Sequence, residues 1–155
     1  MKLHAPADYK CPFCRVVSGI EDEFVRTKQD DIVYQSQKVT AFISSGWWPH
    51  NPGHVLIIPN QHCESTSSLP LELDLEITKV KRIIIDALYN SYNCPGVSTR
   101  QHNGPDGGQD VWHYHLHVFP RYENDRLYKL DQRATTPEER LPYAQKLREY
   151  LQSQD

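Results

Sequence analysis

The sequence lacks any long apolar run and any excess of basic charge. No apolar segment approaches the roughly 20 residues that a membrane-spanning helix needs, and residues 1–10 contain no signal-peptide core. The formal net charge of −3 provides no basic field for a nucleic-acid backbone. We therefore expect a cytoplasmic protein that binds neither membrane nor nucleic acid. Any phosphate ligand must be held by a local site.

Internal repeats, low-complexity segments and a Walker-type phosphate-binding loop are also missing. A chain of 155 residues suits one domain with one sizeable core. The four cysteines are not expected to form disulfides in a reducing compartment. Cys63 and Cys94 have no partner at metal-binding spacing, so we interpret them as small buried residues.

Short β-type runs alternate with turn-forming residues along most of the chain. The first two runs are joined by a polar turn and indicate a hairpin. We interpret residues 11–14 as a tight loop and residues 45–52, with two tryptophans and two prolines, as another. We predict the last strand to end at Pro120. The five predicted strands are residues 31–36, 39–44, 53–59, 97–102 and 111–119.

Two segments have helical patterns. Apolar residues recur at spacings of three and four between Leu73 and Leu88, which predicts one long helix over about residues 71–92. Near the end, Pro142 argues against one unbroken helix, so we predict a short turn and then a terminal helix over about residues 141–151. We interpret the charged C-terminal segment, which includes Arg140, as a solvated helix face. The sum is an α+β fold: an antiparallel sheet of about five strands, one long helix and a C-terminal helix.

Three histidines alternate along the last predicted strand. His113, His115 and His117 are separated by single residues, so they project from one face of the strand. Packing alone does not explain three histidines at this spacing. Two chemistries remain: metal binding through several imidazoles, or attack on phosphorus by a neutral imidazole nitrogen.

The residues before this strand favour phosphate chemistry. Gly104, Gly107 and Gly108 allow backbone N–H groups to approach an anion closely, and Gln109 adds an uncharged donor. These features fit a phosphate site better than a bare metal cage.

Four segments resemble the histidine triad (HIT) family. Residues 113–119 resemble its three-histidine signature, and residues 104–111 resemble the glycine-rich lead-in. Residues 53–59 resemble a buried strand with an active-site histidine, and residues 11–14 resemble the cysteine pair of the zinc-binding bacterial members. The resemblance covers about residues 11–122. It implies one HIT-like domain over residues 1–155, with residues 123–155 as a C-terminal extension.

The resemblance implies a nucleotide hydrolase or nucleotidyl transferase, usually a homodimer. By resemblance, His115 attacks the α-phosphorus of a dinucleoside polyphosphate or nucleoside phosphoramidate and forms a nucleotidyl-histidine intermediate. His117 and His54 match the other catalytic histidines, and Gln109 matches a phosphate-contacting glutamine. The sequence chooses neither the physiological substrate nor between hydrolysis and transfer.

The expected nucleotide pocket departs from the family pattern at several positions. Gly107, Gly108 and Phe42 are expected to line it. Ser44 stands where the family often has an acidic residue for the ribose hydroxyls, and a serine can bind only one hydroxyl. Asp110 replaces a serine or threonine; its carboxylate repels phosphate unless it points away or orients a histidine. His102 is either a further phosphate donor or an ordinary strand residue.

Cys11 and Cys14 supply half of a tetrahedral zinc site. By resemblance, the other two ligands of this structural zinc are His62 and His113, which removes His113 from the chemistry. The alternative is a reduced, unmetallated cysteine pair. Substitute ligands are His4 and Cys63.

Two other functions compete with the enzyme. Ser44 and Asp110 favour a zinc-stabilised nucleotide sensor or scaffold with little turnover. A metal-dependent hydrolase would instead hold its metal on the triad. Trp47 and Trp48 either stack on a base, bury at a dimer contact or pack their loop against the domain.

Overall fold

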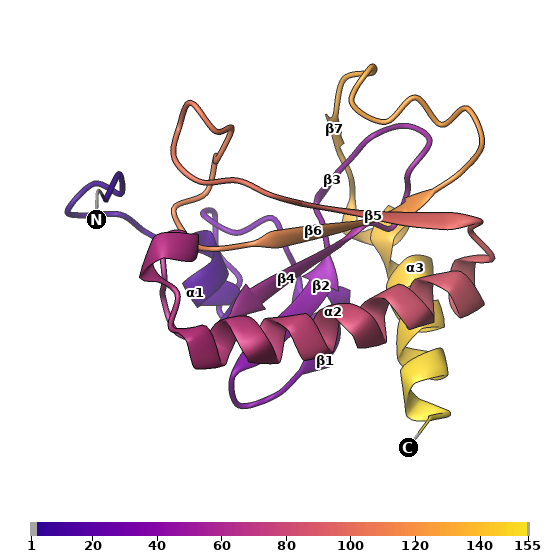
Figure 1. Cartoon of the computed structure of the whole chain (residues 1–155), viewed down its shortest axis with the longest axis horizontal. Helices are drawn as coiled ribbons and strands as arrows, with labels where there is room; N and C mark the ends of the chain where they lie inside the picture. The colour runs from indigo at the N-terminus through magenta and orange to yellow at the C-terminus, as the bar shows by residue number, and fades with distance from the viewer. Residues whose placement is uncertain (1–2, 155) are drawn as a thin grey trace.

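A five-stranded antiparallel sheet forms the centre of the computed structural model, which describes residues 3–154. The order of its strands is β1-β2-β4-β6-β5 (Figure 1). The sheet confirms the predicted α+β architecture. The bounds of its strands, in chain order, are Ile32–Gln35 (β1), Val39–Ile43 (β2), Val55–Pro59 (β4), Gly96–Gln101 (β5) and Leu116–Arg121 (β6).

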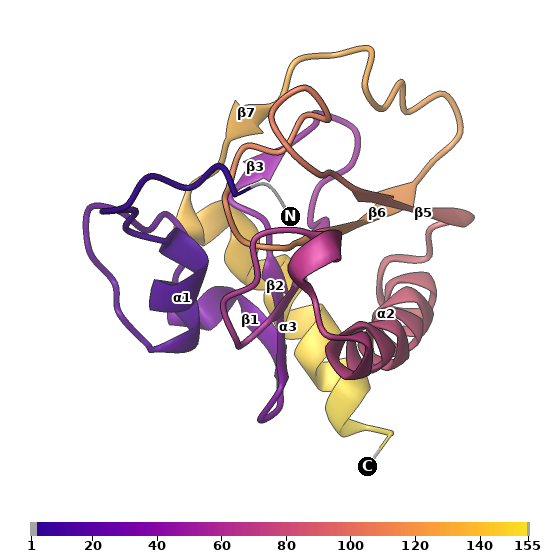
Figure 2. The same ribbon diagram turned by 60° about the vertical axis from the view of Figure 1, so that its left-hand side comes forward.

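Helices lie on both faces of the sheet. The long helix α2 (Leu71–Tyr92) runs along one face and contacts α3 (Pro137–Gln152), while the short helix α1 (Pro12–Val17) lies on the opposite side (Figure 2). Two 3-10 turns, Gln29–Asp31 (η1) and Thr66–Ser68 (η2), precede β1 and α2. None of the helices in residues 3–154 is both long and apolar enough to cross a membrane.

Alternation along the strands divides the apolar side chains between two cores. Ile57 and Val118 face α2 and α3, where they pack with Ile84 and Leu147. On the other face, a smaller cluster beneath α1 contains Phe13, Phe42 and Leu56, among others. His113 and His115 contact Phe13 of this second cluster.

The cysteine pair begins helix α1 instead of forming the predicted tight loop. Cys11 is the N-cap, and its sulfur accepts a hydrogen bond from the Cys14 backbone N–H at 3.4 Å. Pro12 occupies the first helical position, where its missing N–H costs nothing. The pattern was missed because six residues are too few to show helical periodicity.

The predicted loop at residues 45–52 contains a short strand. Gly46–Trp47 (β3) pairs with Arg133–Ala134 (β7), so the C-terminal extension adds a two-stranded ribbon beside the main sheet. Trp47 is buried and meets the Tyr143 ring of α3 edge-on at 5.1 Å. Trp48 covers Phe119 at 5.5 Å, so both tryptophans pack against their own domain.

The prediction that Pro142 interrupts the last helix was wrong. Helix α3 continues through it from Pro137 to Gln152, starting at the capping box of Thr136. Pro142 removes one hydrogen bond in the second turn. Burial of Ala144 and Leu147 against the core offsets that loss.

The last strand is displaced relative to the prediction. His113 and His115 precede β6. The chain bends at His113, whose N–H donates to the Val111 carbonyl oxygen at 2.8 Å, and the Tyr114 N–H donates to the Cys63 carbonyl oxygen at 2.6 Å. At the other end, β6 continues through Pro120, because its pairing with β4 already ends at Val118 and no β4 carbonyl needs a donor there.

Candidate active site

His115 is held in the tautomer that a nucleophile needs. Its Nδ1 lies 2.8 Å from the His113 carbonyl oxygen, which only accepts, so Nδ1–H is the donor. In the neutral ring the lone pair is then on Nε2. The ring is 3% exposed and packs edge-on against Phe13 at 5.3 Å, which fixes its direction. Such a preset imidazole can attack an electrophile without rearranging.

A cleft of about 300 Å³ opens in front of His115 and His117. Phe13, Leu56 and Val111 contribute apolar lining. The polar lining includes Arg26, Ser44, Asp110 and Gln132. The volume lies at the small end of the range for small-molecule sites, which is roughly 300–1,000 Å³. The lining therefore combines apolar side chains with polar groups, and Phe13 lies directly against His115.

His117 and His54 form a neutral pair. His117 Nδ1 lies 3.4 Å from His54 Nε2, and His54 Nδ1 has no partner among residues 3–154. A bare nitrogen lone pair is cheaper to bury than an N–H, so His54 Nε2–H donates to His117 Nδ1. The hydrogen of His117 is then on Nε2, at the cleft. His54 is fully buried, so it positions His117 and does not touch a ligand itself.

Burial keeps both rings uncharged. Desolvation, with a smaller contribution from Arg100, lowers the pKa of His54 to about 3. The pKa of His117 is also well below its usual value, first through burial and then through the neighbouring His54 and His115. At neutral pH, His117 therefore offers the cleft one N–H donor and no charge.

Asp110 faces His115. Its Oδ1 lies 3.5 Å from His115 Nε2, while 80% of its side chain is exposed. The hydrogen bond with His115, which needs a proton on Nε2, lowers the pKa of the Asp110 carboxyl, so the carboxyl is ionised at neutral pH. In the neutral ring this hydrogen bond is absent and Nε2 carries its lone pair. The carboxylate neither points away from the site nor holds the Nδ1 side of the ring.

The glycine-rich turn owes its shape to its glycines, and the amide of Gln109 braces it. A Cβ atom on Gly107 would overlap the Asn103 carbonyl oxygen, and Gly108 has a φ of +83°. Gln109 donates to the Glu64 and Val111 carbonyl oxygens at 2.6 and 3.0 Å. Both amide hydrogens are therefore already used in this structure.

His102 lies just beyond β5, close to the turn. Its Nδ1 is 2.7 Å from the Gly108 carbonyl oxygen, so Nδ1–H donates, and Nε2 of the neutral ring carries the lone pair. The ring centres of His102 and His117 are 5.9 Å apart. His102 thus lies near His117, but it offers a second donor only when protonated.

Two other predicted pocket residues lie further from a ligand. Phe42 is fully buried behind Phe13, which it meets at 5.5 Å, so it shapes the cleft only through that ring. Ser44 borders the cleft, but its hydroxyl donates to the Gly46 carbonyl oxygen at 3.1 Å and accepts from the Gly46 N–H.

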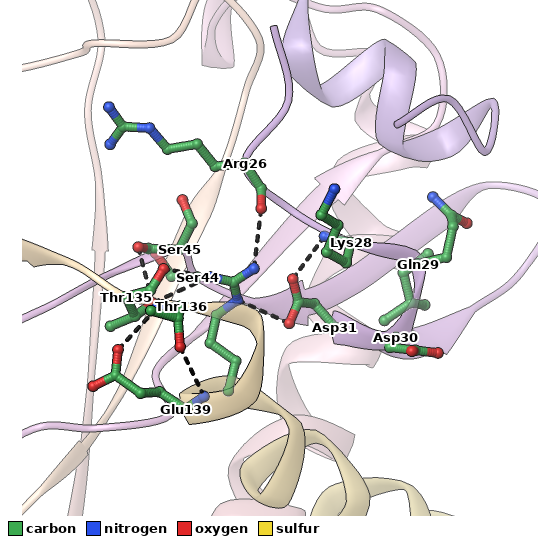
Figure 3. Close-up of polar contacts among 12 residues, drawn as sticks. Arg26, Lys28, Gln29, Asp30, Asp31, Ser44, Ser45, Thr135, Thr136 and Glu139 are labelled. Atoms are coloured by element: carbon green, nitrogen blue, oxygen red, sulfur yellow. Dashed lines mark hydrogen bonds and ion pairs between the residues drawn. The ribbon is translucent and has the colours of Figure 1, made fainter. Parts of the chain in front are cut away.

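A buried ion pair anchors the far wall of the cleft (Figure 3). Arg140 is 1% exposed and donates to Asp31 Oδ1 at 2.9 Å, the Arg26 carbonyl oxygen at 3.0 Å and the Thr135 carbonyl oxygen at 2.7 Å. Thr135 N–H in turn donates to the Ser45 carbonyl oxygen. The side chain of Arg26 extends away from this network. The prediction of a solvated Arg140 was therefore wrong.

Cys11, Cys14, His62 and His113 form a compact cluster with ligand atoms within 4.8 Å of one another. His113 Nε2 donates to the Pro59 carbonyl oxygen at 2.9 Å, so its Nδ1 lone pair faces the two sulfur atoms at 3.4 and 3.6 Å. The hydrogen bond from the Cys14 thiol lowers the pKa of Cys11. Two sulfurs and two imidazoles fit tetrahedral zinc, with the carbonyl fixing the ligand tautomer.

The substitute ligands considered for this cluster lie elsewhere. The ring of His4 stacks on Trp112 at 5.4 Å, and neither His4 nor Cys63 belongs to the group of clustered ligand atoms. Cys63 is buried, which raises the pKa of its thiol.

Comparisons with known proteins agree with this geometry. The HIT domain family model matches residues 25–124. A HIT-like protein of Borreliella burgdorferi is 34% identical over 119 residues, covering 76% of this chain and 79% of that protein. The adenylylsulfatase HINT3 of Arabidopsis thaliana is 25% identical over 118 residues, which cover 76% of this chain and 55% of that protein. The crystal structure of a zinc-bound histidine triad family protein from Mycobacterium smegmatis matches with a TM-score of 0.75 at 25% identity. The match covers 94% of this chain and 98% of that protein.

Proposed function

The chain belongs to the HIT family, and from that premise we propose that it cleaves nucleotides at the α-phosphate through a nucleotidyl-His115 intermediate. The family includes nucleotide hydrolases. The proposed substrates are dinucleoside polyphosphates or nucleoside phosphoramidates. The observation that carries the proposal is the hydrogen bond from His115 Nδ1 to the His113 carbonyl oxygen, because it leaves Nε2 as the free nitrogen.

The chemistry proceeds in two displacements. The Nε2 lone pair of His115 forms the bond to phosphorus, and the bond to the leaving group breaks with its electron pair on the departing atom. The His113 carbonyl oxygen stabilises the positive charge that develops on the ring. His117 Nε2–H donates to a phosphate oxygen. Water, or another acceptor, then attacks phosphorus and releases His115.

The test is turnover of diadenosine tetraphosphate and adenosine phosphoramidate by the wild type and by His115→Asn. Removing the nucleophile should lower kcat by at least about 1,000-fold on both substrates, since losing a covalent step removes most of the catalysis. Under alkaline quench, intact-mass analysis should show an adenylyl adduct only on the wild type. His50→Ala, at an exposed histidine outside the cleft, is the matched control. Full activity in folded His115→Asn would exclude this mechanism.

The second candidate is a nucleotide sensor with little turnover. The exposed carboxylate of Asp110 beside Nε2, and the Ser44 hydroxyl engaged by Gly46, favour it. Wild-type protein that binds AMP in calorimetry but neither turns over these substrates nor forms an adduct would establish the sensor.

The zinc and the dimer belong to the same proposal. Cys11, Cys14, His62 and His113 would hold a structural zinc that ties α1 to the segment carrying His115. With His113 so used, His115 and His117 remain for the cleft.

Strand β5 is an edge strand and can adjoin a second copy of the chain. A monomeric mass in light scattering would exclude the homodimer.

A further inference from the structure

Arg100 places a positive charge beside the histidines, on the side away from the cleft. Arg100 of β5 is paired directly with His117 of β6. Residues directly opposite in an antiparallel pair project to the same face, so Arg100 shares the face of the functional histidines. Its effect on the pKa values of His54 and His117 also indicates that its charge is close to both rings.

Three aromatic rings hold the guanidinium of Arg100. Its central carbon is 4.3 Å from the ring centre of Tyr128, 5.0 Å from that of Trp48 and 5.5 Å from that of Phe119. Cation–π contacts of this kind contribute about 0.5–2 kcal/mol and fix the direction of the planar group. The side chain is therefore placed in advance.

The guanidinium has no anionic partner within residues 3–154. None of the ion pairs there includes Arg100, and its Nε is buried without an acceptor. By contrast, Arg121 on the same face is paired with Asp125 at 2.7 Å. A half-buried arginine without a carboxylate is costly unless a ligand supplies the charge, and its fork of N–H donors matches a phosphate.

The strand order indicates which phosphate that is. Ser44 at the end of β2 and Leu56 of β4 line the cleft, His115 lies at the start of β6, and Arg100 lies beyond it on β5. A nucleotide whose nucleoside occupies the cleft and whose α-phosphate meets His115 extends toward β5 with its remaining groups. Those groups are the leaving group.

We propose, building on the function above, that Arg100 binds a phosphate of the leaving group and selects nucleoside polyphosphates over phosphoramidates. When a phosphoanhydride is cleaved, the bridging oxygen keeps the electron pair and departs as a phosphate anion. A fixed cation stabilises that charge without a proton. An amine leaving group must take up a proton, which arginine does not supply at neutral pH. The neutral state of His54 and His117 agrees with this assignment.

The experiment compares the two substrates in one variant. Arg100→Met keeps a long side chain among the aromatic rings but removes the charge. We expect kcat/KM for diadenosine tetraphosphate to fall about 10- to 100-fold, the range expected for charge-assisted hydrogen bonds. The value for adenosine phosphoramidate should change less than about threefold, since that substrate has no second phosphate. Arg82→Ala, at an exposed arginine of α2, is the control and should leave both values unchanged.

Equal losses on both substrates, or no loss on either, would overturn the role of Arg100. Binding provides a readout that is independent of turnover. The wild type should bind ADP more tightly than AMP, and Arg100→Met should bring the two dissociation constants within about twofold of each other. If the protein proves inactive, the proposed function fails but this ratio still tests Arg100. An unchanged ratio of the two dissociation constants in Arg100→Met contradicts the inference. Arg100→Lys should restore part of the preference for ADP over AMP.

Discussion

Asp110 is the residue whose charge fits least well with a phosphate ligand. Its carboxylate lies 3.5 Å from His115 Nε2, the nitrogen proposed to attack phosphorus, and its exposure screens but does not remove the repulsion. We expect Asp110→Asn to tighten AMP binding roughly threefold at low salt. In 0.5 M salt the Debye length falls to about 4 Å, so the gain in affinity should largely disappear.

Calorimetry with AMP, and with uncharged adenosine as the control ligand, checks this prediction. Adenosine affinity should not change, because the substitution removes charge and little volume. Weaker AMP binding in Asp110→Asn would show that the carboxylate orients His115 in the free protein and that repulsion is secondary.

Single residues could be predicted from the sequence only where their spacing limited the choice. The alternation of His113, His115 and His117 marked this segment as a functional candidate, and the resemblance assigned His113 to the cysteine pair. In the structure His113 joins the cysteine cluster, while His115 and His117 line the cleft. Arg100 and Arg140 could not be assigned in this way. Each is a charged residue in an amphipathic segment, and the groups around Arg140 include Asp31, which is 109 positions away.

At the scale of elements, α1 with its N-cap carries both cysteines of the proposed zinc site. A helix of six residues is too short to be stable alone, and it packs on the sheet through few buried side chains. We expect Cys11→Ser to lose zinc and to lower Tm by roughly 4–8 °C, which corresponds to about 2 kcal/mol in a domain of this size.

Metal analysis by mass spectrometry and a thermal melt check this expectation. Cys63→Ala is the matched control, because Cys63 is a buried thiol outside the cluster, and it should retain zinc. Wild-type protein that is metal-free after purification without chelator would contradict the proposed site.

Elements were predictable where a pattern was long. Helix α2 shows its apolar face over 22 residues, and its predicted bounds agree with the structure. The ribbon of β3 and β7 has two residues in each strand and depends on contacts between distant segments, so no local pattern indicates it. Pro142 misled the prediction because a backbone rule does not include the burial of Ala144 and Leu147.

For the whole molecule, the Arg140–Asp31 pair joins the C-terminal helix to the segment before β1. Removing one partner leaves a buried charge unpaired, so we expect Asp31→Ala to lower the free energy of unfolding by about 3–5 kcal/mol. The double variant Asp31→Ala/Arg140→Met should lose less than the sum of the two single variants. Urea unfolding measures all three.

The exposed pair Lys79–Glu76 provides the control, since breaking it should cost less than about 1 kcal/mol. Additive losses in the double-variant cycle, or a free energy of unfolding for Asp31→Ala within 0.5 kcal/mol (about the usual error of such comparisons) of the wild type, would contradict the coupling.

The wall that the C-terminal extension adds to the cleft has an evolutionary consequence. The family match ends at residue 124, and every histidine of the site precedes that point. Gln132 lines the cleft from beyond it, and Arg140 holds the wall in place. One part of the cleft wall is therefore encoded outside the stretch that carries the histidines. Substitutions in the extension can change that part of the wall while the histidines stay constant.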